Sequence, residues 1–85
     1  MFKSVNDDGS KNICGKNVAR FRKEINISQN ELAHKLQLEG IEVEKNSVQR
    51  LEAGQRFVTD IEVIAFAKVF NKSIEEILGI NEEYA

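Results

Sequence analysis

The sequence predicts a small all-helical domain, and three observations support this prediction. The pattern Ser/Thr-x-x-Glu occurs three times, beginning at Ser28, Thr59 and Ser73, each time just before an apolar segment. In this capping box the hydroxyl accepts a backbone N–H three residues on and the glutamate bonds back, so each copy indicates a helix start. Apolar residues recur at helical spacings of three and four. The 85 residues include no proline and five glycines, so helices can run unbroken while the turns of an all-β fold are scarce.

The first helix is expected over about residues 12 to 25. Four apolar residues at spacings of four, three and four form one stripe along it: Cys14, Val18, Phe21 and Ile25. Asn26 comes next and tolerates a left-handed backbone, so we expect the helix to end there.

The second helix is expected to begin at Gln29 and to stop at Gly40, where Ile41 can fold back onto Leu36. Its inward face consists of Leu32, Ala33 and Leu36. Residues 41–44 then alternate apolar and acidic side chains. Because no partner strand is in view, we interpret these four residues as an extended connector.

Three further helices complete the expected fold. The third, about Lys45 to Ala53, buries Val48 and Leu51 and ends at Gly54. The fourth, Asp60 to Phe70, is apolar nearly all round and is expected to be the buried centre of the domain. Its apolar residues are Ile61, Val63, Ile64, Phe66, Ala67 and Phe70. The fifth is short, from Ile74 to Leu78, and ends at Gly79.

Size and composition limit the class of protein. A chain of 9.7 kDa has room for one core, which excludes a multi-domain enzyme. We expect a flexible segment over residues 1–11, one domain over residues 12–79 and a tail over residues 80–85. A single cysteine cannot form an internal disulfide, and neither a membrane span nor a signal peptide is apparent. The expected location is therefore the cytoplasm.

The sequence contains no recognisable enzymatic or metal-binding motif. Zinc needs about four closely spaced ligands, and this chain offers only Cys14 and His34, on different helices. Cys14 belongs to an apolar stripe and His34 to an outward helix face. Neighbouring glutamates such as Glu75 and Glu76 point in different directions on a helix and make poor acid/base partners. We therefore expect no enzyme, no cofactor and no metal.

Residues 28–54 read SQNELAHKLQLEGIEVEKNSVQRLEAG and carry most of the functional information. With the basic first helix before them and the buried fourth helix after them, they resemble the helix-turn-helix domain of the lambda-repressor-like family, also called the Cro/CI or xenobiotic-response-element type. The resemblance covers roughly residues 14 to 78. Its most diagnostic parts are Ser28-Gln29-x-Glu31-Leu32-Ala33, Val48-x-x-Leu51-Glu52-x-Gly54 and Ser73-Ile-Glu-Glu-Ile-Leu78.

The connection between the second and third helices departs from the family pattern. Eleven residues separate Leu36 from Val48, which is more than the family usually has. The additional length brings in three acids, Glu39, Glu42 and Glu44. Acids beside a surface that meets phosphates weaken DNA binding.

The resemblance implies that the third helix lies in the major groove and reads base edges. Its implied base-reading residues are Lys45, Asn46, Gln49 and Arg50. Arginine or lysine can bond guanine, and asparagine or glutamine can pair with adenine, so these residue types suit the task. The implied backbone contacts are Ser28, Gln29, Asn30, Ser47 and Arg56. Arg22 and Glu52 match family positions that form a structural ion pair.

These observations lead to two functional hypotheses. The first is a sequence-specific DNA-binding transcriptional regulator, most simply a repressor, that binds double-stranded DNA as a homodimer. The expected dimer surface is a C-terminal apolar cluster of Ile74, Ile77, Ile80 and Tyr84. The alternative is an antitoxin or antirepressor-like module that uses the same fold to bind a protein partner, and the sequence pI near 5.4 favours it somewhat.

Overall fold

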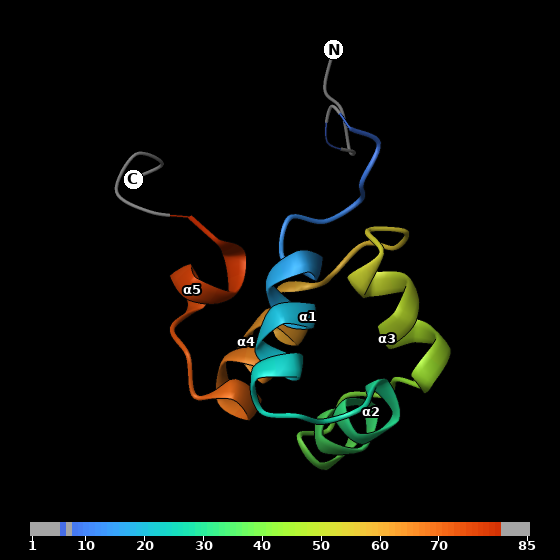
Figure 1. The fold of residues 1–85 in the computed structure, drawn as a ribbon, viewed down its shortest axis with the longest axis vertical. Coiled ribbons are helices and arrows are strands. Elements are labelled where there is room, and N and C mark those ends of the chain that lie inside the picture. The colour runs from blue at the N-terminus through green and yellow to red at the C-terminus, as the bar shows by residue number, and fades with distance from the viewer. Residues whose placement is uncertain (1–5, 7, 81–85) are drawn as a thin grey trace.

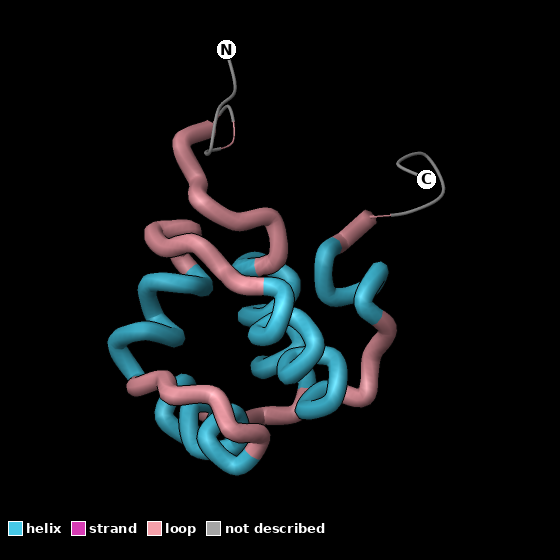
Figure 2. Tube along the Cα trace, turned by 180° about the vertical axis from the view of Figure 1, so that it is seen from behind, coloured by secondary structure: helices cyan, strands magenta, loops and turns pink. Residues whose placement is uncertain are grey.

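The computed structural model describes residue 6 and residues 8–80. They form five helices: α1 (Gly15–Glu24), α2 (Gln29–Leu38), α3 (Lys45–Glu52), α4 (Asp60–Phe70) and α5 (Ile74–Leu78). The described part of the chain contains no strand, so the predicted all-α fold with five helices is confirmed (Figure 2).

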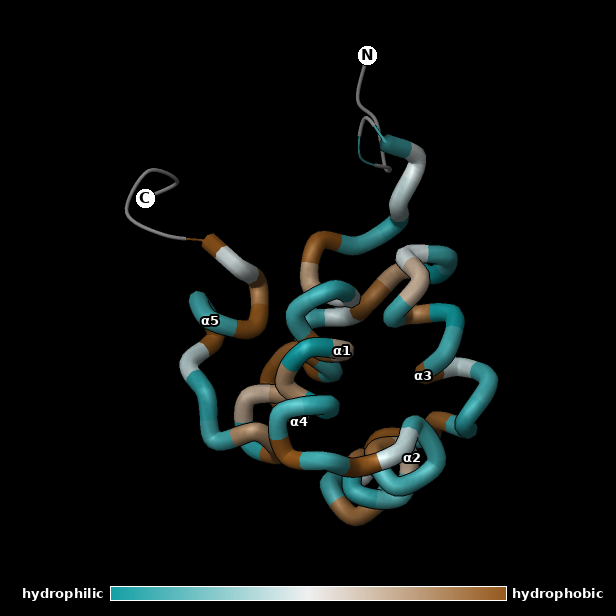
Figure 3. Tube along the Cα trace, viewed as in Figure 1, coloured by the Kyte–Doolittle hydropathy of each residue, from teal (hydrophilic) through white to brown (hydrophobic). Residues whose placement is uncertain are grey.

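The helices surround one apolar core. In Figure 1, α1 and α4 lie in the middle, α5 covers one side, and α2 and α3 lie on the other side. The largest fully buried side chains come from all five helices: Val18, Leu32, Leu36, Val48, Leu51, Phe66 and Ile77. Figure 3 shows brown, hydrophobic stretches along α4 and hydrophilic ones on the outer turns of α1 and α3. Burial of this apolar area is the main favourable contribution to folding.

The predicted helix boundaries agree with the local bonds. All three capping boxes form, because the side chains of Ser28, Thr59 and Ser73 accept backbone N–H groups and the matching glutamates bond back. The left-handed residues that end helices include Asn26, with φ of 59°, and Asn71, with φ of 54°. The turn after α2 closes when the N–H of Ile41 donates to the carbonyl of Leu36 at 3.0 Å. Residues 41–44 form neither helix nor strand, as expected of a connector, and Glu44 at their end has an extended backbone.

Several boundaries and burial assignments were wrong. Helix α1 begins at Gly15 rather than near residue 12, and Ile25 lies beyond its end with 46% of its surface exposed. Ile61 and Ile64 on α4 are 65% and 49% exposed, although the sequence predicted that they would be buried. A helix that is apolar all round does not reveal which face its neighbours cover.

The expected C-terminal apolar cluster is also divided. Ile77 is fully buried in the core, whereas Ile74 is 38% exposed and Ile80 is half-buried. Tyr84 lies outside the described residues. The cluster is therefore not one exposed surface. Among the described residues, no helix is both long and apolar enough to cross a membrane.

Candidate nucleic-acid interface

The outer face of α3 gathers the four residues expected to read bases. Lys45, Asn46, Gln49 and Arg50 are all exposed, while Val48 and Leu51 on the opposite face are buried in the core. The helical repeat of 3.6 residues places these four side chains on one continuous strip. The helix therefore exposes a polar strip while its opposite face is packed into the core.

The N-terminus of α2 lies close to the C-terminal end of α3. Ser28 caps α2, and its hydroxyl accepts the N–H of Glu31 at 3.0 Å. The side-chain nitrogen of Gln29 donates to Glu52 Oε1 at 3.0 Å, which joins the first residue of α2 to the last residue of α3. Asn30 is exposed. Free N–H groups at a helix start favour anions such as phosphate.

An ion pair ties α1 to the same point. Arg22 donates through Nε to Glu52 Oε2 at 2.7 Å and through Nη2 to Glu52 Oε1 at 3.0 Å. Its Nη1 donates to the carbonyl of Ile27 at 2.9 Å. The two side chains retain only 12% and 7% of their exposure, and the hydrogen bonds to Glu52 raise the pKa of Arg22. Arg22, Glu52 and Gln29 thus connect α1, α2 and α3.

Arg56 is engaged within the protein. Its Nη2 and Nη1 donate to the two carboxylate oxygens of Glu62 at 2.7 and 3.2 Å. Its Nε donates to the carbonyl of Ser47 at 3.3 Å, and Nη1 also donates to the carbonyl of Phe57 at 2.7 Å. Four of its five N–H donors are therefore occupied. The sequence predicted that Arg56 contacts DNA. In the structure it holds the segment after α3 against α4 and the first turn of α3.

Glu62 has a second role besides capping α4. Burial alone would raise the pKa of its carboxyl group, but hydrogen bonds from Arg56 and Thr59 outweigh burial, and the pKa lies below its usual value. The capping box pointed to Glu62 as a helix-start residue. Nothing in the local sequence pointed to Arg56 as its partner, so sequence reasoning missed this pair.

Asn12 is another contact that the sequence did not reveal. Its Nδ2 donates to the carbonyls of Leu51 and Arg56 at 3.0 and 2.8 Å, and its Oδ1 accepts the N–H of Gly15 at 2.8 Å. The N–H of Lys11 donates to the carbonyl of Gly54 at 2.8 Å. One short segment before α1 therefore satisfies carbonyl groups at and beyond the end of α3.

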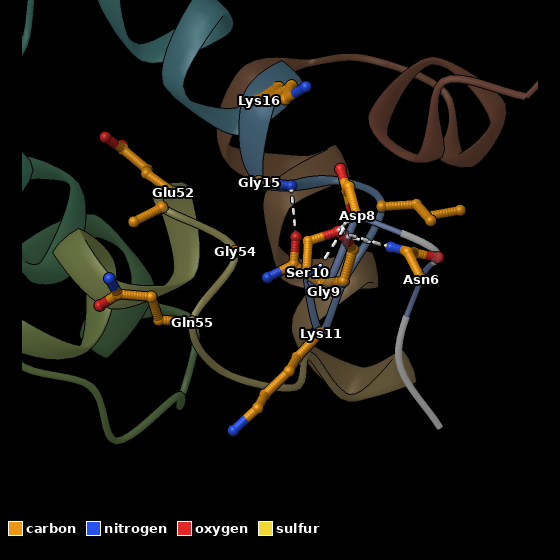
Figure 4. A pocket seen from close by; sticks show the side chains of 13 residues that line it. Asn6, Asp8, Gly9, Ser10, Lys11, Gly15, Lys16, Glu52, Gly54 and Gln55 are labelled. Carbon is orange, nitrogen blue, oxygen red and sulfur yellow. Dashed lines mark hydrogen bonds between the residues drawn. The ribbon is translucent and has the colours of Figure 1, made fainter. Parts of the chain in front are cut away.

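These contacts border a hollow between the N-terminal segment and the C-terminal end of α3 (Figure 4). Gly15 lies in its wall, and a Cβ at this position would collide with the carbonyl oxygen of Leu51. Cys14 is buried beside it, and burial raises the pKa of the Cys14 thiol to about 11. A thiol that stays neutral near pH 7 is not a nucleophile, so Cys14 is a core residue.

The acidic connector lies at the other end of α3. Glu39, Glu42 and Glu44 are all exposed. The connector itself is fixed, because Val43 is buried and its carbonyl accepts a hydrogen bond from Gln37 Nε2 at 2.7 Å. His34 is exposed on α2, and the described residues contain no group of three or more possible metal ligands.

Comparisons with known proteins identify this arrangement. A family model described as helix-turn-helix matches residues 18–77. No curated protein sequence matches the chain significantly. The solved structure of the restriction-modification controller protein C.AhdI from Aeromonas hydrophila is similar, with a TM-score of 0.64 and 22% identity. The similarity covers 74% of this chain and 84% of that one, and it supports the fold.

Proposed function

We propose that the chain is a sequence-specific repressor, because it belongs to the Cro/CI-type helix-turn-helix family of DNA-binding transcriptional regulators. In this proposal α3 lies in the major groove, and Lys45, Asn46, Gln49 and Arg50 contact base edges. The observation that carries the proposal is the exposed strip formed by these four side chains on a helix whose other face is buried. Occupying a promoter site is enough for repression.

The proposed contacts to the DNA backbone come from the start of α2 and from α3. Ser28, Gln29 and Asn30 direct the free N–H groups of α2 towards one phosphate, and Ser47 is a candidate for a second. Arg56 keeps one free N–H donor for a phosphate, so its main contribution is to hold its segment in place.

The proposed working unit on DNA is a homodimer. One domain reads only a few base pairs, which gives too little discrimination among the sites of a genome. The exposed face of α4 suits the contact better than the divided C-terminal cluster, because it carries Ile61 and Ile64. Asp60 and Lys68 lie one helical turn before and after Ile64, and both are exposed. A two-fold axis beside Ile64 would place Asp60 of each copy opposite Lys68 of the other.

The dimer is tested by sedimentation at micromolar protein, with and without a selected DNA site. We expect two copies per site for the natural chain, and a one-to-one complex for Ile64→Glu, because the new carboxylates would face each other across the axis. A monomer in solution together with a one-to-one complex of the natural chain on DNA would refute the dimer.

Base reading is tested by selecting bound sequences from a random DNA pool. Arg50→Ala removes a base contact and is expected to cost about 1–3 kcal/mol on the selected site and to relax its base preference. Gln29→Ala removes a side-chain amide beside the proposed phosphate contact, where one of its two N–H groups bonds Glu52, and is expected to weaken selected and random DNA alike. Loss of affinity by the same factor for all sequences in Arg50→Ala would refute the assigned roles.

The second candidate function is the protein-binding module, and the exposed acids of the connector favour it. Salt separates the two candidates. Binding to random duplex DNA through phosphates releases counterions and falls steeply with salt, whereas a module that binds only a protein shows no such binding to DNA. We expect the steep dependence. Negligible binding to any duplex at low salt would favour the protein partner.

A further inference from the structure

The acidic connector ends in a residue placed differently from the other two acids. Glu44 directly precedes α3 and occupies its N-cap position, with an extended backbone at φ of −116° and ψ of 169°. Its side chain is exposed and lies next to Lys45 and Asn46 in sequence, at the end of α3 that carries the proposed base-reading strip. Glu39 lies at the other end of the connector, where it ends α2.

Among the described residues, Glu44 differs from the N-cap residues of α2, α4 and α5 in its side-chain bonds. The N-cap side chains of α2, α4 and α5 all accept a backbone N–H, whereas Glu44 makes no such bond. Of the described residues, the ion pairs involve Arg22 with Glu52 and Arg56 with Glu62, and neither includes Glu44. Its oxygens are therefore available as acceptors.

The backbone of Glu44 is held in place on both sides. Val43 is buried with its carbonyl bonded to Gln37, and the carbonyl of Glu44 accepts the N–H of Val48 at 3.1 Å. A side chain on a fixed backbone loses less entropy on binding than one on a flexible loop. The backbone that carries Glu44 is therefore fixed, while its side chain is exposed to solvent.

A carboxylate can face DNA only where a base offers a donor. In the major groove, guanine presents O6 and N7 and thymine presents O4, and these acceptors repel it. Adenine combines its N6 donor with the N7 acceptor, whereas cytosine presents the N4 donor alone. The chemistry therefore favours cytosine.

From this juxtaposition we infer that Glu44 is a specificity-determining residue that accepts a hydrogen bond from cytosine N4, beside the base contacts of Lys45 and Asn46. The inference rests on the proposed function, because it needs α3 in the major groove. It also gives a role to the longer, acidic connection between α2 and α3. An acid there weakens binding to all phosphates but improves discrimination between base pairs.

The experiment compares sequences selected from a random DNA pool by the natural chain, Glu44→Gln and Glu42→Gln. The two variants lose the same charge from the same connector. We expect the natural chain to select a C·G pair at one position, and Glu44→Gln to reduce that preference about tenfold and shift it towards adenine, which glutamine can pair. Glu42→Gln should keep the preference and bind all sequences slightly better. Thermal melting of both variants checks that the fold is retained.

The outcomes separate the inference from the proposed function. If Glu44→Gln selects the same bases with the same preference as the natural chain, the inference is overturned and the proposed function stands. If both variants lose the preference equally, charge alone is responsible and the inference is likewise overturned. If the natural chain enriches no sequence, the proposed function fails, and the role of Glu44 fails with it.

Discussion

At its C-terminal end α3 is bonded to three other parts of the chain, whereas among the described residues no side chain caps its N-terminal end. Glu52 binds Arg22 and Gln29, and the carbonyl of Leu51 is bonded by Asn12. The difference separates two tasks. One end fixes the orientation of the helix, and the other leaves polar side chains free to meet a ligand.

The largest effect is expected from breaking the ion pair at the C-terminal end. Arg22→Met or Glu52→Leu leaves a charge in a largely buried place and should cost about 3–5 kcal/mol of the free energy of unfolding. Replacing both should cost less than the sum, because the double variant strands no charge. Urea melts of the two single variants and the double variant measure this coupling, and additive losses would show that the residues do not interact.

A methyl group added at Gly15, where α1 meets α3, should have the next largest effect. Alanine for glycine usually stabilises a helix by up to about 1 kcal/mol. At Gly15 the sign should reverse, because the added Cβ collides with the carbonyl of Leu51, and we expect a net loss of about 2 kcal/mol. Lys16→Ala, on the exposed side of α1, is the matched control and should change stability by less than about 0.5 kcal/mol. A Gly15→Ala protein as stable as the natural chain would show that the two helix ends move apart freely.

Protonation of Glu62 should loosen the segment after α3. Its pKa is lowered in the folded protein, so its contribution to stability is present above its ordinary value of 4.5 and is lost as the pH falls through the lower folded value. Glu62→Gln should cost about 1–2 kcal/mol at pH 7 and should flatten the dependence of stability on acid pH. Urea melts at several pH values measure both effects. Equal acid sensitivity of variant and natural chain would assign the acid response to other groups.

The sequence predicted the helix boundaries better than the contacts at the C-terminal end of α3, and the reason is distance along the chain. Capping boxes and left-handed asparagines act within four residues, so they are visible in the sequence. Asn12 meets Leu51 and Arg56 across 39 and 44 residues, and no local pattern encodes such a contact. The ion pair of Arg22 with Glu52 came only from resemblance to a family.

The same limit explains the errors on α4. Ile61, Ile64, Val63 and Phe66 are alike in hydropathy, and only the packing of α1, α2 and α5 against α4 decides which of them is covered. The base-reading assignment remains a prediction for a related reason. Exposure on α3 is a property of the chain alone, whereas base contact depends on DNA.

The smallest effect should come from closing the open end. Glu44→Ser supplies a hydroxyl that can accept the N–H of Ser47, a cap usually worth about 1 kcal/mol. It also removes a negative charge that interacts favourably with the start of α3, a loss of about 0.5 kcal/mol. The net gain should be about 0.5 kcal/mol, and Ser28→Ala, which removes an existing cap from α2, should act in the opposite direction by about 1 kcal/mol. Thermal melts of both variants make the comparison. A destabilised Glu44→Ser protein would mean that the carboxylate stabilises the start of α3 by more than the new cap does, and the N-terminal end would then be held by charge rather than left open for a ligand.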